Sequence, residues 1–175
     1  IPQLFRYERQ QKGRLREHFQ FNADVIGESD VAVDAELIAL LIDTLRSFGL
    51  TEDDFVIRLS SRNAWQQFFE TRNQKPETRN GNAYAFFQII DKLEREKPEE
   101  SKAQLAKLDI AFDDVEKFIS GGKPTEELDS ILKNLAARGL AAFVKIDYHV
   151  IRGLAYYTGV VFEAFDRKGE FRAIA

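Results

Sequence analysis

Two stretches at the start of the chain contain enough aromatic and β-branched residues for strands, and a polar stretch separates them. Residues 1–9 and 17–26 have the composition of strands, and the polar stretch 10–16 between them contains Gly13, which favours a turn. We therefore predict an antiparallel hairpin with a long loop at the start of this sequence.

Alternation along these two strands predicts one apolar and one polar face, because successive side chains of a strand point to opposite sides. The apolar face is expected to hold Phe5, Tyr7, Phe19, Phe21, Ala23 and Val25. The polar face is expected to hold Leu4, Arg6, Glu8, His18, Gln20, Asn22 and Asp24. Paired strands bring such groups within reach of one another, so this face can offer a cation to a phosphate and carboxylates to amino groups.

The periodicity changes to that of helices further along the chain. Apolar residues recur every three or four positions over residues 31–48, and Gly49 follows as a left-handed cap. The apolar stretch FVIRLS, residues 55–60, then predicts a short buried strand. Residues 62–138 have helical spacing again, and the last helix of this part is expected to begin after Thr125 as its N-cap.

The chain returns to strand composition after Gly139, which ends that last helix. Residues 141–148 and 154–166 are the two stretches concerned. We predict an α+β fold, in which an antiparallel β-sheet carries the hairpin and both later strands, is flanked by helices and is interrupted by a helical insertion. The implied domains are a core of residues 1–61 and 139–175 and an insertion of residues 62–138.

Length and composition narrow the function classes. The 175 residues are 44% hydrophobic, which suffices for a buried core. There are 25 Lys and Arg against 29 Asp and Glu, so the net charge of −4 lacks the broad basic surface of a general nucleic-acid binder. The chain has no cysteine, which excludes disulfides and thiolate metal sites, and we predict no metal-ligating residues.

Targeting features are also missing from the sequence. No apolar run reaches the length of a membrane span, and there is no signal-peptide pattern. The first residue is Ile1 and methionine does not occur, so we expect the sequence to be a piece of a longer protein.

The stretch FRYERQQKGR, residues 5–14, gathers cations in a chain that is acidic overall. A solvated hairpin tip is the usual explanation of such a charge run. Arg6 and Glu8, however, lie within the predicted strand and share its polar face. Their placement favours a binding face over a solvated tip.

A second stretch, HVIRGLAYYTGVVFE, covers residues 149–163. It can be read as a core strand with tyrosines at its rim, entered through a turn at Gly153. Tyr156 and Tyr157 would then face opposite sides of the strand. Gly159 would leave one face without a side chain, which is expected where a ligand approaches the backbone.

Both stretches carry a family resemblance. The segment FRYERQQKGRLREHFQFNADVIG, residues 5–27, resembles motif 2 of class II aminoacyl-tRNA synthetases in the form carried by histidyl-tRNA synthetases. The segment RGLAYYTGVVFE, residues 152–163, resembles the histidine signature of that family, usually R-G-L-D-Y-Y-T-G. The two occur in the family's order with a helical insertion between them, and the resemblance covers essentially the whole chain.

The sequence departs from the family pattern at two places. Ala155 stands where many members have Asp, and the aromatic order of EHF, residues 17–19, is exchanged relative to the commoner form. Several bacterial-type and plastid-type members share both features. We therefore interpret the departures as markers of that subtype.

The resemblance implies an ATP site on the hairpin. Arg6 would bind the α-phosphate of ATP and the carboxylate of histidine. Glu8 would accept a hydrogen bond from the adenine amino group, and Arg14 would contact the terminal phosphates. An aromatic side chain near the end of the loop would stack on the adenine ring, and the face assignment favours His18 over Phe19 for this contact. A Mg²⁺ ion would bridge the other phosphates.

The resemblance also implies a histidine site built from both motifs. Gln20 and Asp24 would contact the bound amino acid, with Asp24 at the imidazole. Arg152 corresponds to the family's second catalytic arginine. Tyr157 would meet the other ring nitrogen, and Tyr156 would line the pocket.

The implied reaction depends on positioning and on neutralisation of charge. In amino-acid activation the histidine carboxylate attacks the α-phosphorus, and this nucleophile is already charged, so no general base is needed. Arg6 and Arg152, the expected catalytic residues, can stabilise the spread charge of the transition state. The implied partners are L-histidine, ATP and tRNA(His), with a homodimer in the full-length enzyme, a cytoplasmic location and no membrane association.

Several parts of the family pattern are expected elsewhere in the longer protein. These are motif 1, motif 3 with its ATP-binding arginine, the loop that contacts the α-amino group, and the anticodon-binding domain. We therefore regard the chain as a catalytic-core fragment that is inactive or weakly active alone.

Two other functions stay open at this point. The regulatory subunit of ATP phosphoribosyltransferase is a non-catalytic, histidine-binding paralogue of the same fold, but it has no need of the cations that would cradle a triphosphate. A structural module without a ligand would leave the grouping of Gln20, Asp24 and Arg152 unexplained. Exchange of pyrophosphate into ATP distinguishes the enzyme from both alternatives.

Overall fold

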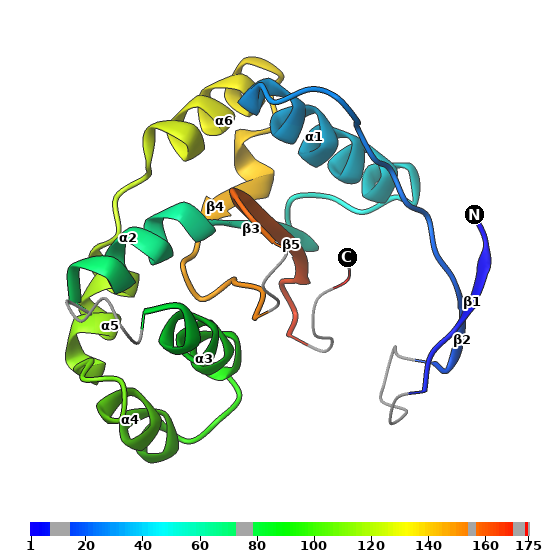
Figure 1. Ribbon diagram of the computed structural model, residues 1–175. Coiled ribbons are helices and arrows are strands. Elements are labelled where there is room, and N and C mark those ends of the chain that lie inside the picture. The colour runs from blue at the N-terminus through cyan, green and yellow to red at the C-terminus, as the bar shows by residue number, and fades with distance from the viewer. Residues whose placement is uncertain (8–14, 73–78, 154–156, 170–173, 175) are drawn as a thin grey trace.

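The computed structural model describes residues 1–7, 15–72, 79–153, 157–169 and 174. The strands are β1 (Gln3–Phe5), β2 (Glu17–Phe19), β3 (Phe55–Ser61), β4 (Val144–Ile146) and β5 (Val160–Asp166). The helices are α1 (Val31–Ser47), α2 (Arg62–Arg72), α3 (Arg79–Lys92), α4 (Pro98–Ala106), α5 (Phe112–Gly121) and α6 (Glu126–Ala137), with a 3-10 turn at Ala141–Phe143. The α+β class predicted from the sequence is confirmed (Figure 1). Within the described part of the chain, no helix is long and apolar enough to cross a membrane.

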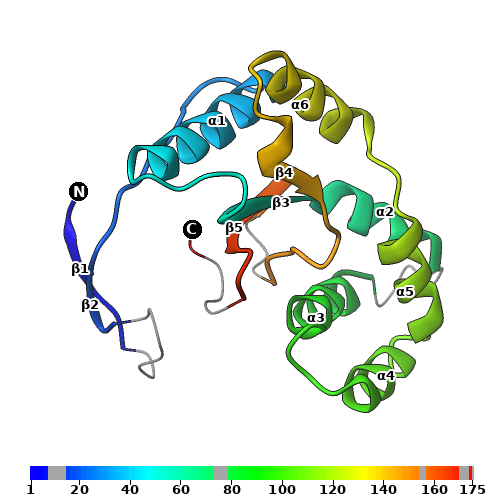
Figure 2. The same ribbon diagram turned by 180° about the vertical axis from the view of Figure 1, so that it is seen from behind.

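The strands form two separate sheets. One is a three-stranded sheet of order β4-β3-β5, in which β3 pairs with β5 antiparallel along its whole length and with β4 parallel. The other is the two-stranded antiparallel hairpin β1-β2, in which Leu4 lies opposite His18. Figures 1 and 2 show the hairpin apart from the larger sheet, joined to α1 by an extended segment.

This topology corrects the predicted single antiparallel sheet. Between the described strands, no pairing joins the hairpin to β3, β4 or β5. Strand β4 is parallel to β3 because the chain between them passes through five helices and returns in the same direction, as a crossover connection does. Periodicity within one strand carries no information about such a crossover.

The strands are also shorter than predicted. Strand β2 ends at Phe19, since that residue already lies opposite Gln3 near the start of its partner. Strand β4 covers only the middle of the predicted stretch 141–148, because the 3-10 turn occupies its first residues. Strand β5 begins at Val160, and residues 157–159 of the predicted strand 154–166 precede it, while residues 154–156 lie outside the described part of the chain.

The helix ends follow the sequence signals. Gly49 and Gly139 both adopt left-handed φ angles, of 86° and 73°, directly after the helices they were predicted to end. The Thr125 hydroxyl accepts a hydrogen bond of 3.3 Å from the backbone N–H of Leu128, as an N-cap does. These signals are local, which explains why α1 and α6 were predicted to within a residue or two.

One continuous hydrophobic core connects the sheet and the helices. Helices α1 and α6 pack on each other and on β3 (Figure 1). Helices α2, α3 and α5 surround Trp65, whose ring packs against Phe68, Phe86, Phe118 and Tyr148. One prediction stays open, namely the division into a core of residues 1–61 and 139–175 and an insertion of residues 62–138. Helix α6 belongs to the predicted insertion but packs against α1 of the predicted core, so it lies where the two parts would meet.

Candidate functional site

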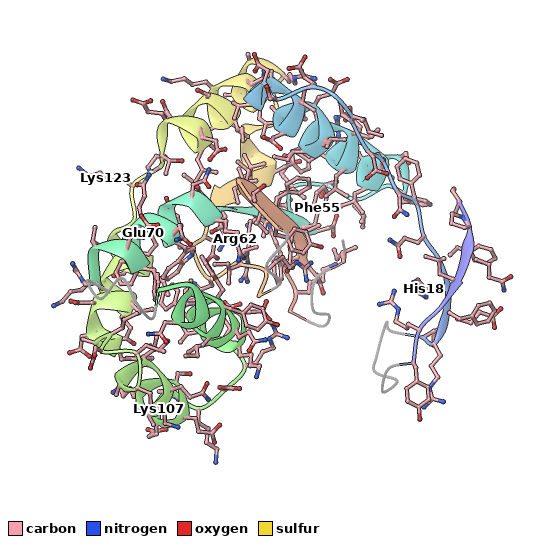
Figure 3. All side chains as sticks on the ribbon, viewed as in Figure 1. His18, Phe55, Arg62, Glu70, Lys107 and Lys123 are labelled. Atoms are coloured by element: carbon pink, nitrogen blue, oxygen red, sulfur yellow. The ribbon has the colours of Figure 1, made fainter. Side chains whose placement is uncertain are left out.

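The polar face of the hairpin holds Arg6 and His18 together. Leu4 and His18 are directly opposite in the register, and the Arg6 guanidinium contacts Nε2 of His18. The backbone N–H of Arg6 donates to the carbonyl of Arg16 at 2.8 Å, which keeps Arg6 beside the returning strand. Figure 3 shows His18 on the side of the hairpin that is turned toward the helices and the larger sheet. The predicted face assignment is confirmed for these residues.

The opposite face of the hairpin is open to solvent. Phe5 is 74% exposed and Phe19 is 72% exposed, whereas Arg6 and His18 are half-buried. Of the two candidates for stacking on adenine, His18 is therefore the one that shares a face with Arg6. The stacking role itself stays a prediction.

Three of the predicted site residues fall outside the described part of the chain. They are Glu8 and Arg14, expected at the ATP, and Tyr156, expected in the histidine pocket. Their roles stay predictions.

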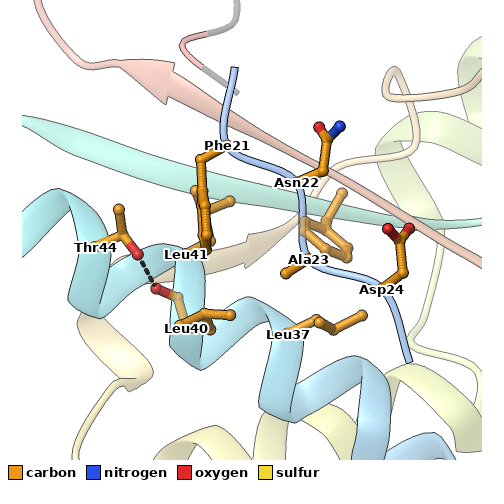
Figure 4. Close-up of a pocket in the computed structure, with 9 residues that line it drawn as sticks. Phe21, Asn22, Ala23, Asp24, Leu37, Leu40, Leu41 and Thr44 are labelled. Carbon is orange, nitrogen blue, oxygen red and sulfur yellow. Dashed lines mark hydrogen bonds between the residues drawn. The ribbon is translucent and has the colours of Figure 1, made fainter. Parts of the chain in front are cut away.

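Asp24 lies in the extended segment between β2 and α1, beside a pocket of about 330 Å³. The pocket is lined by Phe21, Asn22, Ala23 and Asp24, by Leu37, Leu40, Leu41 and Thr44 of α1, and by Phe162 of β5. Figure 4 shows Phe21 directed toward α1, and Asn22 and Asp24 directed away from it. The predicted alternation of polar and apolar side chains thus continues past the end of β2.

Gln20 lies at the start of the same segment. Its side-chain amide donates to Asn22 Oδ1 at 2.7 Å, so the structure joins it to Asn22 and not directly to Asp24. Its backbone N–H donates to the carbonyl of Pro2 at 3.2 Å and extends the pairing of the hairpin by one bond.

Arg152 forms an ion pair with Glu163 of β5. The Glu163 side chain is only 14% exposed, and burial raises the pKa of its carboxyl group, while the positive charge of Arg152 opposes that rise. Arg152 also lines a hollow of about 240 Å³ against α3, together with Gln88 and Asp91. Glu163 therefore restrains the guanidinium that was predicted to be catalytic.

Tyr157 lies in a different hollow. It precedes β5, is 37% exposed, and lines a space of about 330 Å³ with Arg62 of α2 and Phe87 of α3. Since Tyr157 lies outside the strand, the predicted division of the two tyrosines between strand faces does not apply to it. Asp24 and Tyr157 line separate hollows, so the structure does not bring these two predicted imidazole contacts together.

Gly159 marks the turn that leads into β5. Its φ angle is 65°, a left-handed conformation that favours glycine. Among the described residues, a Cβ atom at this position would meet the Glu127 carboxylate at 3.6 Å, which is an ordinary contact. The backbone turn into β5 is therefore sufficient to account for this glycine, and the approach of a ligand stays a prediction.

A charged cluster that was not predicted from the sequence lies at the centre of the larger sheet. Arg58 of β3 donates to Glu94 at 3.2 Å, lies 3.6 Å from an Asp147 carboxylate oxygen, and stacks over the ring of Phe165 at 3.9 Å. Nδ1 of His149 is 2.8 Å from the same carboxylate. Arg58 is the only charged residue in FVIRLSS, and a single charge within such an apolar strand was the sign in the sequence that it needs charged partners.

The cluster changes the acidity of its members. Burial acts to raise the pKa of Asp147, but hydrogen bonds from His149 and the charge of Arg58 outweigh it and hold that pKa well below its usual range. The hydrogen bond to Asp147 raises the pKa of His149 above its usual value of 6.5. The folded protein therefore favours an ionised Asp147 beside a protonated His149.

A pH dependence of stability follows from this pair. Because the pKa of His149 is raised on folding, its contribution is complete below pH 6.5 and is lost as the pH rises through the raised value. The contribution of Asp147, whose pKa is lowered, is present above its usual 3.8 and is lost only in stronger acid. We expect the melting temperature to fall as the pH rises above 6.5 and passes through the raised pKa of His149, and His149→Gln to flatten that slope. Thermal melts across this range, with Asp147→Asn and the double variant as controls, test it; an unchanged slope in His149→Gln would contradict it.

Comparison with known proteins gives matches that cover essentially the whole chain. A family model described as histidyl-tRNA synthetase matches residues 1–175. The histidine–tRNA ligase of Opitutus terrae is 43% identical over 198 residues, which cover 100% of this chain and 44% of that protein. The chloroplastic/mitochondrial histidine–tRNA ligase of Arabidopsis thaliana is 36% identical over 190 residues, which cover 99% of this chain and 38% of that protein. The chain thus spans less than half the length of these relatives.

Two solved structures share the fold. A histidyl-tRNA synthetase from Nostoc sp. PCC 7120 matches with a TM-score of 0.63 at 23% identity, over 78% of this chain and 37% of that one. An ATP phosphoribosyltransferase regulatory subunit/histidyl-tRNA synthetase from Bacillus halodurans matches with a TM-score of 0.63 at 20% identity, over 81% and 41%. At these identities the likeness concerns the fold alone.

Proposed function

The chain belongs to the histidyl-tRNA synthetase family, and on this basis we propose that the protein carrying it is a histidine–tRNA ligase, which activates L-histidine with ATP and transfers it to tRNA(His). The observation that carries the proposal is the family match, which spans both arginine-bearing motifs. The proposal includes a class II sheet as the catalytic core, with residues 62–138 as an insertion. A homodimer and a cytoplasmic location are further parts of it that follow from the family alone.

The chemistry proposed for the site is adenylate formation. A carboxylate oxygen of histidine attacks the α-phosphorus of ATP, a new oxygen–phosphorus bond forms, and the bond to the departing pyrophosphate breaks. The carboxylate carries the negative charge from the start, so no side chain has to remove a proton. Arg6 follows β1 in the hairpin and Arg152 lies in the segment between β4 and β5, and the two would neutralise the charge shared by the two reactants.

The ion pair with Glu163 suits this role of Arg152. A guanidinium has five N–H donors in a planar fork, so one edge can bind a carboxylate while the other remains available to a phosphate or a second carboxylate. Glu163 is mostly buried, and it would therefore fix the plane of the fork before the substrates arrive. This prior orientation lowers the cost of aligning the charge with the transition state.

The remaining contacts are assigned as the family resemblance implies. Glu8 and Arg14 would bind ATP beside Arg6. The histidine site would contain Gln20, Asp24, Arg152, Tyr156 and Tyr157. Among the described residues, no group of three or more His, Asp or Glu side chains could hold a metal ion. The family resemblance implies a Mg²⁺ ion that bridges phosphates of ATP, a common binding mode of this cation.

The proposal predicts histidine-dependent exchange of labelled pyrophosphate into ATP by the full-length protein. The expected result is exchange with histidine and none with phenylalanine or without amino acid. A regulatory subunit of ATP phosphoribosyltransferase would instead bind histidine without any exchange. Binding measured by calorimetry together with absent exchange would therefore overturn the proposed function in favour of that alternative.

A further inference from the structure

Arg62 is a buried arginine at the junction of β3 and α2. It is only 9% exposed, and its guanidinium carbon lies 3.8 Å from the centre of the Phe87 ring on α3. A stacked guanidinium of this kind is held in one plane, which a lysine cannot reproduce. Burial lowers the pKa of Arg62. A buried charge is costly unless its hydrogen bonds are well placed, so the partners of this one matter.

The hydrogen-bond partners of Arg62 are the first and last residues of the eight-residue histidine signature, Arg152 and Gly159. Its Nη1 donates to the backbone carbonyl of Arg152. Its backbone N–H donates to the carbonyl of Gly159 at 2.8 Å. One residue thus joins the beginning and the end of the segment that carries Arg152 and Tyr157. Figure 3 shows Arg62 where α2 meets the strands.

Arg62 also helps to form the hollow around Tyr157. Both residues line the same space of about 330 Å³, together with Phe87. The stack on Phe87 fixes the guanidinium against α3, and the bond to the Arg152 carbonyl fixes the signature against the guanidinium. A change at Arg62 therefore reaches Arg152 and Tyr157 together.

We propose that Arg62 is a positioning residue for the histidine signature, which sets the placement of Arg152 and Tyr157 without touching the substrates itself. The inference rests on the proposed function, because it assigns those two residues to the histidine side of the reaction. ATP is assigned mainly to the hairpin, and within the described residues Arg62 forms its hydrogen bonds with Arg152 and Gly159 and not with the hairpin. Loss of Arg62 is therefore expected to affect histidine more than ATP.

The test uses steady-state pyrophosphate exchange by the full-length protein. Arg62→Met keeps the length of the side chain and removes its donors, and we expect it to lower kcat/KM for histidine on the order of 100-fold, as a misplaced catalytic group does. The KM for ATP should stay close to the wild-type value. Arg62→Lys keeps a charge and a donor, and it should recover part of the loss. The matched control is Arg72→Met, which removes an arginine from the same helix that pairs with Asp114 at 3.0 Å.

Exchange by the wild type tests the proposed function, and it does so independently of Arg62. If the wild type exchanges pyrophosphate, equal values of kcat/KM for histidine in Arg62→Met and Arg72→Met would overturn the inference. A parallel rise of the KM values for histidine and ATP, with a lower melting temperature, would also overturn it, because it would indicate general loss of structure. Hydrogen exchange at the backbone N–H groups of Arg152 and Val160 gives a second readout, and faster exchange in Arg62→Met alone is expected.

Discussion

Replacing Arg6 or Arg152 by alanine is expected to slow adenylate formation in the full-length protein by about 100- to 1,000-fold. Each guanidinium would face charge that grows in the transition state, and contacts of this kind contribute roughly 3 to 4 kcal/mol each in comparable oxyanion sites. Arg6 follows β1 and Arg152 lies between β4 and β5, so the two guanidinium groups are placed by different parts of the chain. The measurement is the single-turnover rate of adenylate formation at saturating histidine and ATP.

Folding has to be controlled separately for Arg152, since its removal leaves Glu163 buried without its cation. The double variant Arg152→Ala/Glu163→Gln removes that unpaired charge, and it should be as slow as Arg152→Ala alone. Lys133→Ala is the surface control, because this exposed residue pairs with Asp129 one turn away on α6. Equal and mild losses in all of these variants would support a solvated hairpin, and would contradict the assignment of Arg6 and Arg152.

The second large effect concerns the choice of histidine. An imidazole presents one donor and one acceptor, so a selective site offers a partner to each nitrogen. An ionised Asp24 can accept, and the Tyr157 hydroxyl can donate. A buried site built around such hydrogen bonds rejects an analogue without them on the order of 10,000-fold, so strong discrimination against phenylalanine is expected.

Substitutions at these two residues test the prediction. Asp24→Asn should weaken histidine binding less than Asp24→Ala, because the amide oxygen still accepts a hydrogen bond. Tyr157→Phe removes one partner and keeps the shape of the side chain. The two residues line separate hollows, so the experiment also shows whether both act on one ring. Unchanged affinity for histidine in Asp24→Ala and Tyr157→Phe would refute the assignment of both residues.

Local signals explain which parts of the fold were predictable. Helix α6 begins after the Thr125 cap and ends before the left-handed Gly139, and both signals lie within a turn of the helix itself. The parallel pairing of β3 with β4 depends on a connection of more than 80 residues, and no pattern within either strand specifies it. The short pairing of β2 likewise depends on its partner, since the composition of residues 17–26 is that of a strand throughout.

The same distinction applies to the candidate site. Strand alternation sufficed to place Arg6 and His18 on one face, because the hairpin is local in sequence. Arg62 reaches a carbonyl 90 positions further along the chain, and the sequence around it gives no sign of that bond. The partnership of Asp147 with Arg58 is similarly distant. The residues assigned to the substrates belong to two sequence motifs, whereas Arg62, which we propose to position one of these motifs, belongs to neither.

Trp65 gives the protein a built-in optical probe of the helices around it. It is the only tryptophan in the chain, it is fully buried, and its indole N–H donates to the carbonyl of Tyr148 at 3.0 Å. Its emission spectrum reports the environment formed by α2, α3 and α5, while far-ultraviolet circular dichroism reports every helix, α1 and α6 included. Denaturation curves recorded by the two signals would coincide if the residues around Trp65 unfold together with the sheet, and would separate if residues 62–138 unfold as a unit of their own.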